Sequence, residues 1–197
     1  MKDTTSILNI NRKDEYYNKI AFISLLSYAQ EPSYVSDLFG GVGGFMAETK
    51  LKFPGVPAEI FEMDPLCLEV LKAKDIPDCS IIPGNCLELF HAKPDSGVIA
   101  DFNLMTLKRA QVEFHDFLYS MFRSRIKWLI LTDSAGAKLH INYPIYGCSS
   151  PKLFDYITRW NAWLRPFGYH IQKWQRPHFR SVLFLITSKE DDNVSSW

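Results

Sequence analysis

The sequence predicts an α/β fold: a doubly wound, mostly parallel seven-stranded sheet with helices on both faces and a reversed strand in a C-terminal β-hairpin. Segments that look like strands alternate with segments that look like helices, which is typical of a parallel sheet covered on both faces. Residues 128–131 are all apolar, as in a strand buried on both faces. The last two strand-like segments are joined by so short a link that they must run antiparallel.

The individual elements follow from spacing and from turn residues. Residues 16–28 carry apolar side chains at helical spacing, and Pro65 is suited to the first turn of a helix. Proline and glycine clusters such as 53–55 mark the ends of elements. The expected helices are 16–28, 45–51, 65–74, 107–122 and 151–164. The expected strands are 34–39, 58–63, 80–82, 97–100, 128–131, 169–175 and 179–187.

Length and charge limit the classes of protein that fit. A chain of 197 residues builds one well-packed domain, expected at 14–188 between flexible ends at 1–13 and 189–197. Lys and Arg total 22, as do Asp and Glu, so no net charge draws the whole protein toward nucleic acid or a membrane. The start of the chain lacks a secretory leader, no apolar run is long enough for a membrane span, and the four cysteines show no zinc-site spacing. We therefore expect a cytoplasmic protein with no membrane association and no metal.

The stretch DLFGGVGG, residues 37–44, places four glycines within five positions directly after an apolar strand. Glycine destabilises regular elements, so this cluster indicates a turn that side chains would obstruct. It could be a plain tight turn. However, a helix follows and the next strand ends in acids about 20 residues further on, which is typical of a nucleotide-type ligand held outside the carboxyl ends of the strands. Glu62 and Asp64 are placed to accept hydrogen bonds from a ribose diol.

Two cofactor classes fit a glycine turn of this kind. Dinucleotide enzymes use G-x-G-x-x-G/A, in which the third small residue allows close packing of helix and strand. Aligning Gly41 and Gly43 with that pattern puts Met46 at the third position, which counts against a nicotinamide cofactor.

DLFGGVGG resembles motif I of class I S-adenosylmethionine-dependent methyltransferases, above all the D-x-F-x-G-x-G form found in nucleic-acid methylases. EMDP (62–65) and PGNCLEL (83–89) are similar to the second and third motifs of that family. The resemblance covers residues 14–187 and implies S-adenosylmethionine as cofactor. It also implies a residue set for cofactor binding, which comprises Asp37, Phe39, Gly41, Gly43, Glu62, Asp64, Asn85 and Cys86.

The resemblance assigns a role to each member of this set. Asp37 would contact the methionine part of the cofactor, with Phe39 and the two glycines shaping that pocket. Glu62 would hold the ribose hydroxyls, with Asp64 as second candidate. Asn85 replaces a usual aspartate, and its carbonyl can accept the same hydrogen bond from the adenine amino group. Cys86 would line an adenine face or else belong to the core.

Methyl transfer from a sulfonium requires alignment of the reacting groups and removal of a proton from a neutral acceptor, and it needs no metal. By the resemblance, the acceptor site lies after the fourth strand, where the chain reads Asp101-Phe102-Asn103. Asp101 and Asn103 are the catalytic candidates and Phe102 could stack on a base; alternatively, Asp101 and Asn103 cap a turn. Amino-methylating DNA enzymes usually have D/N/S-P-P-Y/F at this point, but this chain lacks the two prolines. Cytosine-C5 enzymes need a Pro-Cys nucleophile, and the sequence contains no Pro-Cys, which excludes C5 chemistry.

The segment 132–147 should lie beside the acceptor site. Its Lys138, His140, Tyr143 and Tyr146 are candidate substrate-binding residues. Residues 138–180 are rich in cations and interleaved aromatic rings, a combination suited to nucleic acid with an exposed base, although Trp160 and Trp163 could equally be core residues. Ribose methyltransferases use a Lys-Asp-Lys-Glu set. Lys19, Asp101 and Lys138 could fill three of its places, but no convincing glutamate follows in the last strands.

These observations favour a methyltransferase that modifies nucleic acid, DNA or RNA, at a base amino group. The alternatives are a methyltransferase for a small molecule or a protein, and an S-adenosylmethionine-binding protein without catalysis. Since the core fold uses the whole length, recognition of a specific sequence would call for a protein partner.

Overall fold

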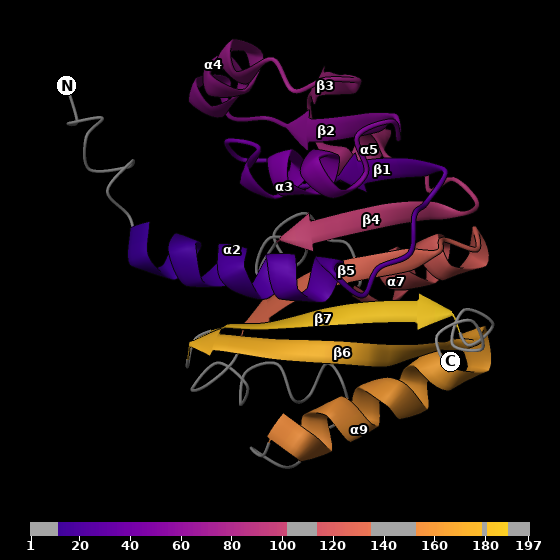
Figure 1. Ribbon diagram of the computed structural model, residues 1–197. Coiled ribbons are helices and arrows are strands. Elements are labelled where there is room, and N and C mark those ends of the chain that lie inside the picture. The colour runs from indigo at the N-terminus through magenta and orange to yellow at the C-terminus, as the bar shows by residue number, and fades with distance from the viewer. Residues whose placement is uncertain (1–11, 102–113, 135–152, 179–180, 189–197) are drawn as a thin grey trace.

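A seven-stranded sheet runs through the molecule, with helices on both of its faces (Figure 1). The computed structural model describes residues 12–101, 114–134, 153–178 and 181–188. The strands lie in the order β3-β2-β1-β4-β5-β7-β6. Their bounds are β1 Tyr34–Asp37, β2 Ala58–Glu62, β3 Cys79–Pro83, β4 Ser96–Asp101, β5 Trp128–Ser134, β6 Tyr169–His178 and β7 Ser181–Ser188.

Strands β1 to β5 pair in parallel, whereas β7 runs antiparallel to both of its neighbours, β5 and β6. The predicted fold class is thereby confirmed, including the reversed strand of the C-terminal hairpin. The helices are α2 Arg12–Leu26, α3 Gly44–Lys52, α4 Pro65–Lys74, α5 Cys86–Leu89, α7 Phe114–Arg123, α9 Leu153–Leu164 and the 3-10 turn η2 Arg165–Phe167.

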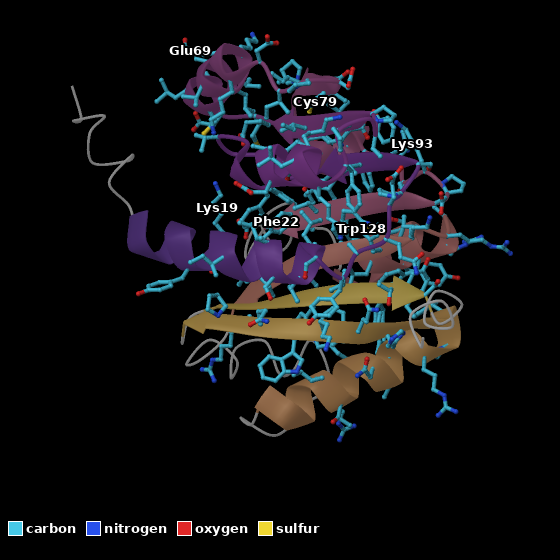
Figure 2. All side chains as sticks on the ribbon, viewed as in Figure 1. Lys19, Phe22, Glu69, Cys79, Lys93 and Trp128 are labelled. Atoms are coloured by element: carbon cyan, nitrogen blue, oxygen red, sulfur yellow. The ribbon has the colours of Figure 1, made fainter. Side chains whose placement is uncertain are left out.

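Each face of the sheet has its own apolar core. Leu118 of α7 and Trp160 of α9 belong to the cluster on one face. Phe22 of α2, Met46 of α3 and Leu71 of α4 belong to the cluster on the other. Figure 2 shows Phe22 beside α2, together with Trp128 from β5 of the same cluster. Burial on both sides explains why β5 reads as a continuous apolar run.

A few elements differ from the sequence prediction. β1 ends at Asp37 rather than at residue 39, because the chain already turns at Leu38 and Phe39. The one-turn helix α5 was not predicted, since four residues are too few to show helical periodicity. Residues 107–113, 151–152 and 179–180 lie outside the described residues, and the domain bounds 14–188 stay a prediction. Within the described chain, no helix has the length and apolar character needed to cross a membrane.

Gly97 of β4 and Trp128 of β5 are paired across the sheet, and their packing leaves no room for a side chain on the glycine. A Cβ added at Gly97 would lie 2.1 Å from Cζ2 of the indole. Trp128 is fully buried, and its Nε1 donates a 2.9 Å hydrogen bond to the carbonyl of Gln30. The ring therefore cannot move aside without breaking that bond.

We predict that Gly97→Ala lowers the free energy of unfolding by about 1–3 kcal/mol, as overpacking of a core does. Urea denaturation measures the change. Gly55→Ala is the matched control, because nothing lies within 4 Å of an added Cβ there. Equal stabilities of the two variants would contradict the prediction.

Candidate functional site

The strands β1, β2 and β4 end at the same edge of the sheet (Figure 1), and each of them ends in an acidic residue. Asp37 is the last residue of β1, Glu62 of β2 and Asp101 of β4. The strands are parallel neighbours, so their carboxyl ends must meet. In the sheet, β1 has β2 as its neighbour on one side and β4 as its neighbour on the other. This is therefore the point where the strand order reverses, and open parallel sheets bind their ligands at such a point.

The glycine turn between β1 and α3 lies over this edge. Gly41 and Gly43 have φ of 50° and 72°, a left-handed conformation that side chains disfavour. A Cβ added at Gly40 would lie 2.0 Å from Ile60 Cγ2. A Cβ added at Gly41 or Gly44 would have no neighbouring atom within 4 Å. The cluster thus has two functions: Gly40 packs against β2, and the surface above Gly41 and Gly44 is open to a ligand.

Glu62 holds the turn and the end of β2 together. Its Oε2 accepts a 2.7 Å hydrogen bond from the Gly41 N–H. Its Oε1 accepts hydrogen bonds from the N–H groups of Met63 and Asp64, at 2.8 and 2.7 Å. Three backbone donors therefore fix the orientation of this carboxylate beside the open face of the turn.

Asp37 is 2% exposed. Burial, the negative charge of Asp101 and, to a smaller extent, that of Glu62 raise the pKa of Asp37 to about 7, against the opposing effect of the Phe39 N–H. That N–H donates to Oδ1 at 3.4 Å, a long contact. Among the described residues, no lysine or arginine forms an ion pair with Asp37. A cation bound beside Asp37 would favour the ionised carboxylate that burial and its acidic neighbours disfavour, so this position suits a cationic ligand.

Asp64 and Asn85, both expected to contact a cofactor, cap helices. Oδ1 of Asp64 accepts from the N–H groups of Leu66 and Cys67, at 2.8 and 3.2 Å, and so begins α4. Oδ1 of Asn85 accepts from Leu87 N–H at 3.1 Å and so begins α5. Each residue already has one oxygen engaged, and in Asn85 it is the very carbonyl expected to receive the adenine amino group.

The remaining cofactor candidates belong partly to the core. Cys86 is 4% exposed, and burial raises the pKa of its thiol to about 12, so it is an apolar filler under α5. Phe39 is half-buried and packs against the same cluster. By contrast, Met63 is 70% exposed at the end of β2.

The acceptor side of the site is described only in part. Asp101 is exposed at the end of β4, where it lies opposite Thr132 of β5. Phe102, Asn103, Lys138, His140, Tyr143 and Tyr146 lie outside the described residues. Lys19 forms a 2.6 Å ion pair with Glu48 of α3, so its charge is already balanced. No group of His, Cys, Asp or Glu within the described ranges could hold a metal ion.

The aromatic residues of 153–178 divide between core and surface. Trp160 is 2% exposed, and the half-buried Trp163 packs against the same cluster. Trp174 of β6 is 45% exposed. Of these three rings, that of Trp174 is the most exposed and so the most accessible to a base.

No protein-family model matches the chain, and no curated protein matches its sequence. Solved structures do match its fold. M. jannaschii TYW2 in complex with AdoMet is 15% identical with a TM-score of 0.54, over 87% of this chain and 76% of that one. The ribosomal protein L11 methylase of Lactobacillus delbrueckii subsp. bulgaricus is 13% identical with a TM-score of 0.59, over 88% and 79%.

A proposed RNA methyltransferase of Pyrococcus horikoshii is 12% identical with a TM-score of 0.55, over 88% of this chain and 84% of that one. The chain spans less than two thirds of two other similar P. horikoshii proteins, namely 64% and 61% of their lengths. At these identities the comparisons establish a shared fold and nothing finer.

We predict that Asp37→Asn makes the protein more stable above pH 7. Between about pH 4 and 7 the folded protein holds a proton on Asp37 that the unfolded chain has lost, so folding stability falls as pH rises through this window. The neutral amide lacks this penalty, which is of the order of a few kcal/mol at pH 8 and disappears near pH 4. Urea denaturation at pH 4, 6 and 8 measures the difference.

Asp116→Asn is the control, since Asp116 is exposed on α7 and lies on a different part of the molecule. Its stability should follow that of the unmodified protein across the three pH values. A stability gap between Asp37→Asn and the unmodified protein that stays constant with pH would contradict the prediction.

Proposed function

We propose that the protein is an S-adenosylmethionine-dependent methyltransferase that modifies nucleic acid at an amino group of a base. The observation that carries the proposal is the open glycine turn at the switch point of the sheet, surrounded by Asp37, Glu62 and Asp101.

The donor set fits this cofactor chemically. S-adenosylmethionine carries positive charge on its sulfonium and its ammonium group, and it presents a ribose diol. The buried Asp37 would attract the cationic part, and Glu62, already oriented by three N–H groups, would accept from the diol. Gly41 and Gly44 would leave space for the ligand to lie against the backbone. M. jannaschii TYW2, which shares the fold, was solved with AdoMet.

The bound cofactor would supply a methyl group on a good leaving group. The chain would orient the amino nitrogen in line with the methyl–sulfur bond and accept its proton. Asp101 would accept the amino proton while the methyl group passes to the nitrogen and the sulfonium sulfur leaves with the electron pair of the broken carbon–sulfur bond. Asn103 would add a second acceptor for the amino group, and Phe102 would stack on the base.

Nucleic acid as acceptor is supported by two observations. One of the proteins sharing the fold is a proposed RNA methyltransferase. The second is Trp174 of β6, whose side chain is 45% exposed and available for stacking on a base. In this proposal Lys138, His140, Tyr143 and Tyr146 would contact the strand, and a protein partner would add sequence recognition.

A protein acceptor is the second candidate, because the L11 methylase shares the fold equally well. The missing proline pair after Asp101 further favours an acceptor other than a DNA base, or a cofactor-binding protein without catalysis.

We expect S-adenosylmethionine to bind less tightly as pH falls from 8 to 5. A cation beside Asp37 stabilises the carboxylate, so binding must release the proton that the apo protein holds below pH 7. The affinity should fall by up to about tenfold per pH unit. Calorimetry in two buffers of different ionisation enthalpy measures both the affinity and the proton release. Asp37→Asn should bind the cofactor more weakly, and its affinity should no longer depend on pH. Constant affinity over this range would contradict a cation beside Asp37.

We further expect Asp101→Ala to reduce methyl transfer by at least about 100-fold, the usual contribution of a proton acceptor, while leaving cofactor affinity within a few-fold. Transfer of labelled methyl groups to total RNA, to denatured DNA and to protein from a cell lysate measures activity and separates the acceptor classes. Asp116→Asn on α7 is the control. Full activity of Asp101→Ala would overturn the acceptor site, whereas absence of cofactor binding in the unmodified protein would overturn the whole proposal.

A further inference from the structure

A cavity lies at the opposite edge of the sheet from the glycine turn. It has a volume of about 780 Å³, within the range of small-molecule sites. Its lining includes Asp95 and Lys127, which directly precede β4 and β5, and Tyr169, which begins β6. The cavity is therefore at the amino ends of β4 and β5, one strand length away from Asp37 and Asp101. No residue of the carboxylate site contributes to it.

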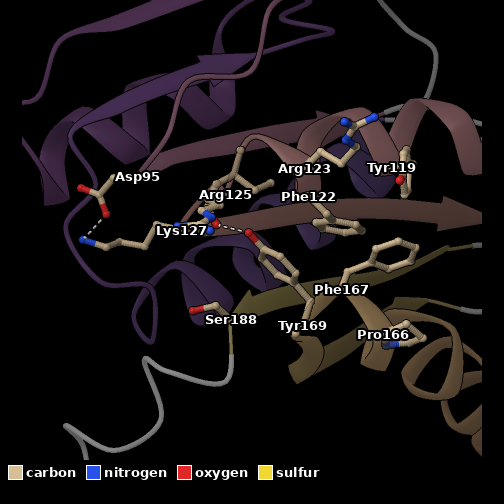
Figure 3. A pocket seen from close by; sticks show the side chains of 12 residues that line it. Asp95, Tyr119, Phe122, Arg123, Arg125, Lys127, Pro166, Phe167, Tyr169 and Ser188 are labelled. Atoms are coloured by element: carbon tan, nitrogen blue, oxygen red, sulfur yellow. Dashed lines mark hydrogen bonds and ion pairs between the residues drawn. The ribbon is translucent and has the colours of Figure 1, made fainter.

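The lining combines cations with aromatic rings. Arg123, Arg125 and Lys127 supply three positive charges against the single carboxylate of Asp95 (Figure 3). Lys127 Nζ pairs with Asp95 Oδ1 at 2.9 Å and also donates to the Glu31 carbonyl at 2.9 Å, so both of these charges are used. The two exposed arginines remain, and no described carboxylate pairs with either of them.

The aromatic wall is rigid on the inside and accessible at the rim. Phe122 and Tyr169 are buried, with ring centroids 4.5 Å apart, and the Tyr169 hydroxyl donates to the Ile126 carbonyl at 2.6 Å. At the rim, Tyr119 is 41% exposed and meets Phe167 edge to face at 5.3 Å. The Arg123 guanidinium lies 5.4 Å from the Tyr119 ring centroid. A planar ring could stack on Tyr119 with an anion next to it.

The backbone at Arg125 provides an independent observation. Arg125 has φ of 55°, and it follows the end of α7, where glycine is the usual residue. The other non-glycine residues with positive φ in the described chain are all aspartates, a type that tolerates this conformation far better. One of them, Asp95, lines the same cavity, and its N–H donates to the Arg125 carbonyl at 2.9 Å. Arginine at a position whose backbone conformation favours glycine indicates that the guanidinium group has a function.

We propose that this cavity binds a nucleotide unit, with the phosphate on Arg125 and Arg123 and the base on the ring of Tyr119. Guanidinium groups bind phosphate through paired charge-assisted hydrogen bonds, and bases stack on aromatic faces regardless of sequence. The unit comes either from a free mononucleotide or from a nucleic-acid strand. The site lies outside the proposed methyl-transfer centre and is occupied independently of it.

Arg125→Gly tests the proposal without unfolding the protein, because glycine suits a φ of 55° and the melting temperature should stay equal or rise. UMP, uridine and a single-stranded ten-nucleotide oligouridylate are titrated into the cofactor-free protein. UMP should bind the unmodified protein more tightly than uridine, and Arg125→Gly should weaken UMP by at least about tenfold while leaving uridine unchanged. Tyr119→Ala should weaken both ligands.

Lys72→Gln on α4 removes one exposed positive charge elsewhere and should leave UMP affinity unchanged. Glu62→Gln should also leave it unchanged, which separates this cavity from the glycine turn. Tighter binding of the oligouridylate than of UMP assigns the site to a strand, and equal binding assigns it to a free nucleotide. No UMP binding, or equal UMP affinity in Arg125→Gly and the unmodified protein, would overturn the proposal.

Discussion

The common direction of β1, β2 and β4 is the constraint on which the rest of the site depends. Parallel neighbours must end at the same edge, so the acids that close these strands, Asp37, Glu62 and Asp101, are brought together. Coulombic repulsion among them opposes folding, yet no described lysine or arginine neutralises Asp37. A site that keeps this repulsion when no ligand is bound is organised for a positively charged ligand. The repulsion lowers the free energy of unfolding, and the same acidic groups are the ones that would bind the cation.

Glu62 shows how a single side chain serves both architecture and chemistry. By accepting from Gly41, Met63 and Asp64, it joins the glycine turn to the end of β2 and holds the approach to the site in place. Gly40 acts from the other side, since its lack of a Cβ lets the turn pack directly on Ile60. The open surface above Gly41 is therefore supported from beneath by packing and from the side by hydrogen bonds.

A net charge of zero conceals a strong polarity along the strands. Carboxylates gather at the carboxyl ends of β1, β2 and β4, whereas Arg123, Arg125 and Lys127 gather near the amino ends of β4 and β5. The sheet separates the two groups, so each edge can attract a ligand of opposite sign. Composition averages over both edges and does not reveal this division.

The order of the elements, the reversed hairpin strand and the glycine turn could be predicted from the chain alone, because these depend on local periodicity and on residues close in sequence. The sequence also identified Asp101 as the acid that ends its strand, whereas Asp37 was expected inside a strand that continues to residue 39 and in fact ends β1. Folding was needed to show that Asp64 and Asn85 cap helices, that Cys86 and Trp160 are core residues, and that Arg125 adopts a left-handed conformation beside a cavity. Burial, capping geometry and the meeting of α7 with β6 arise from contacts between distant segments, and such contacts leave no periodic signal in the chain.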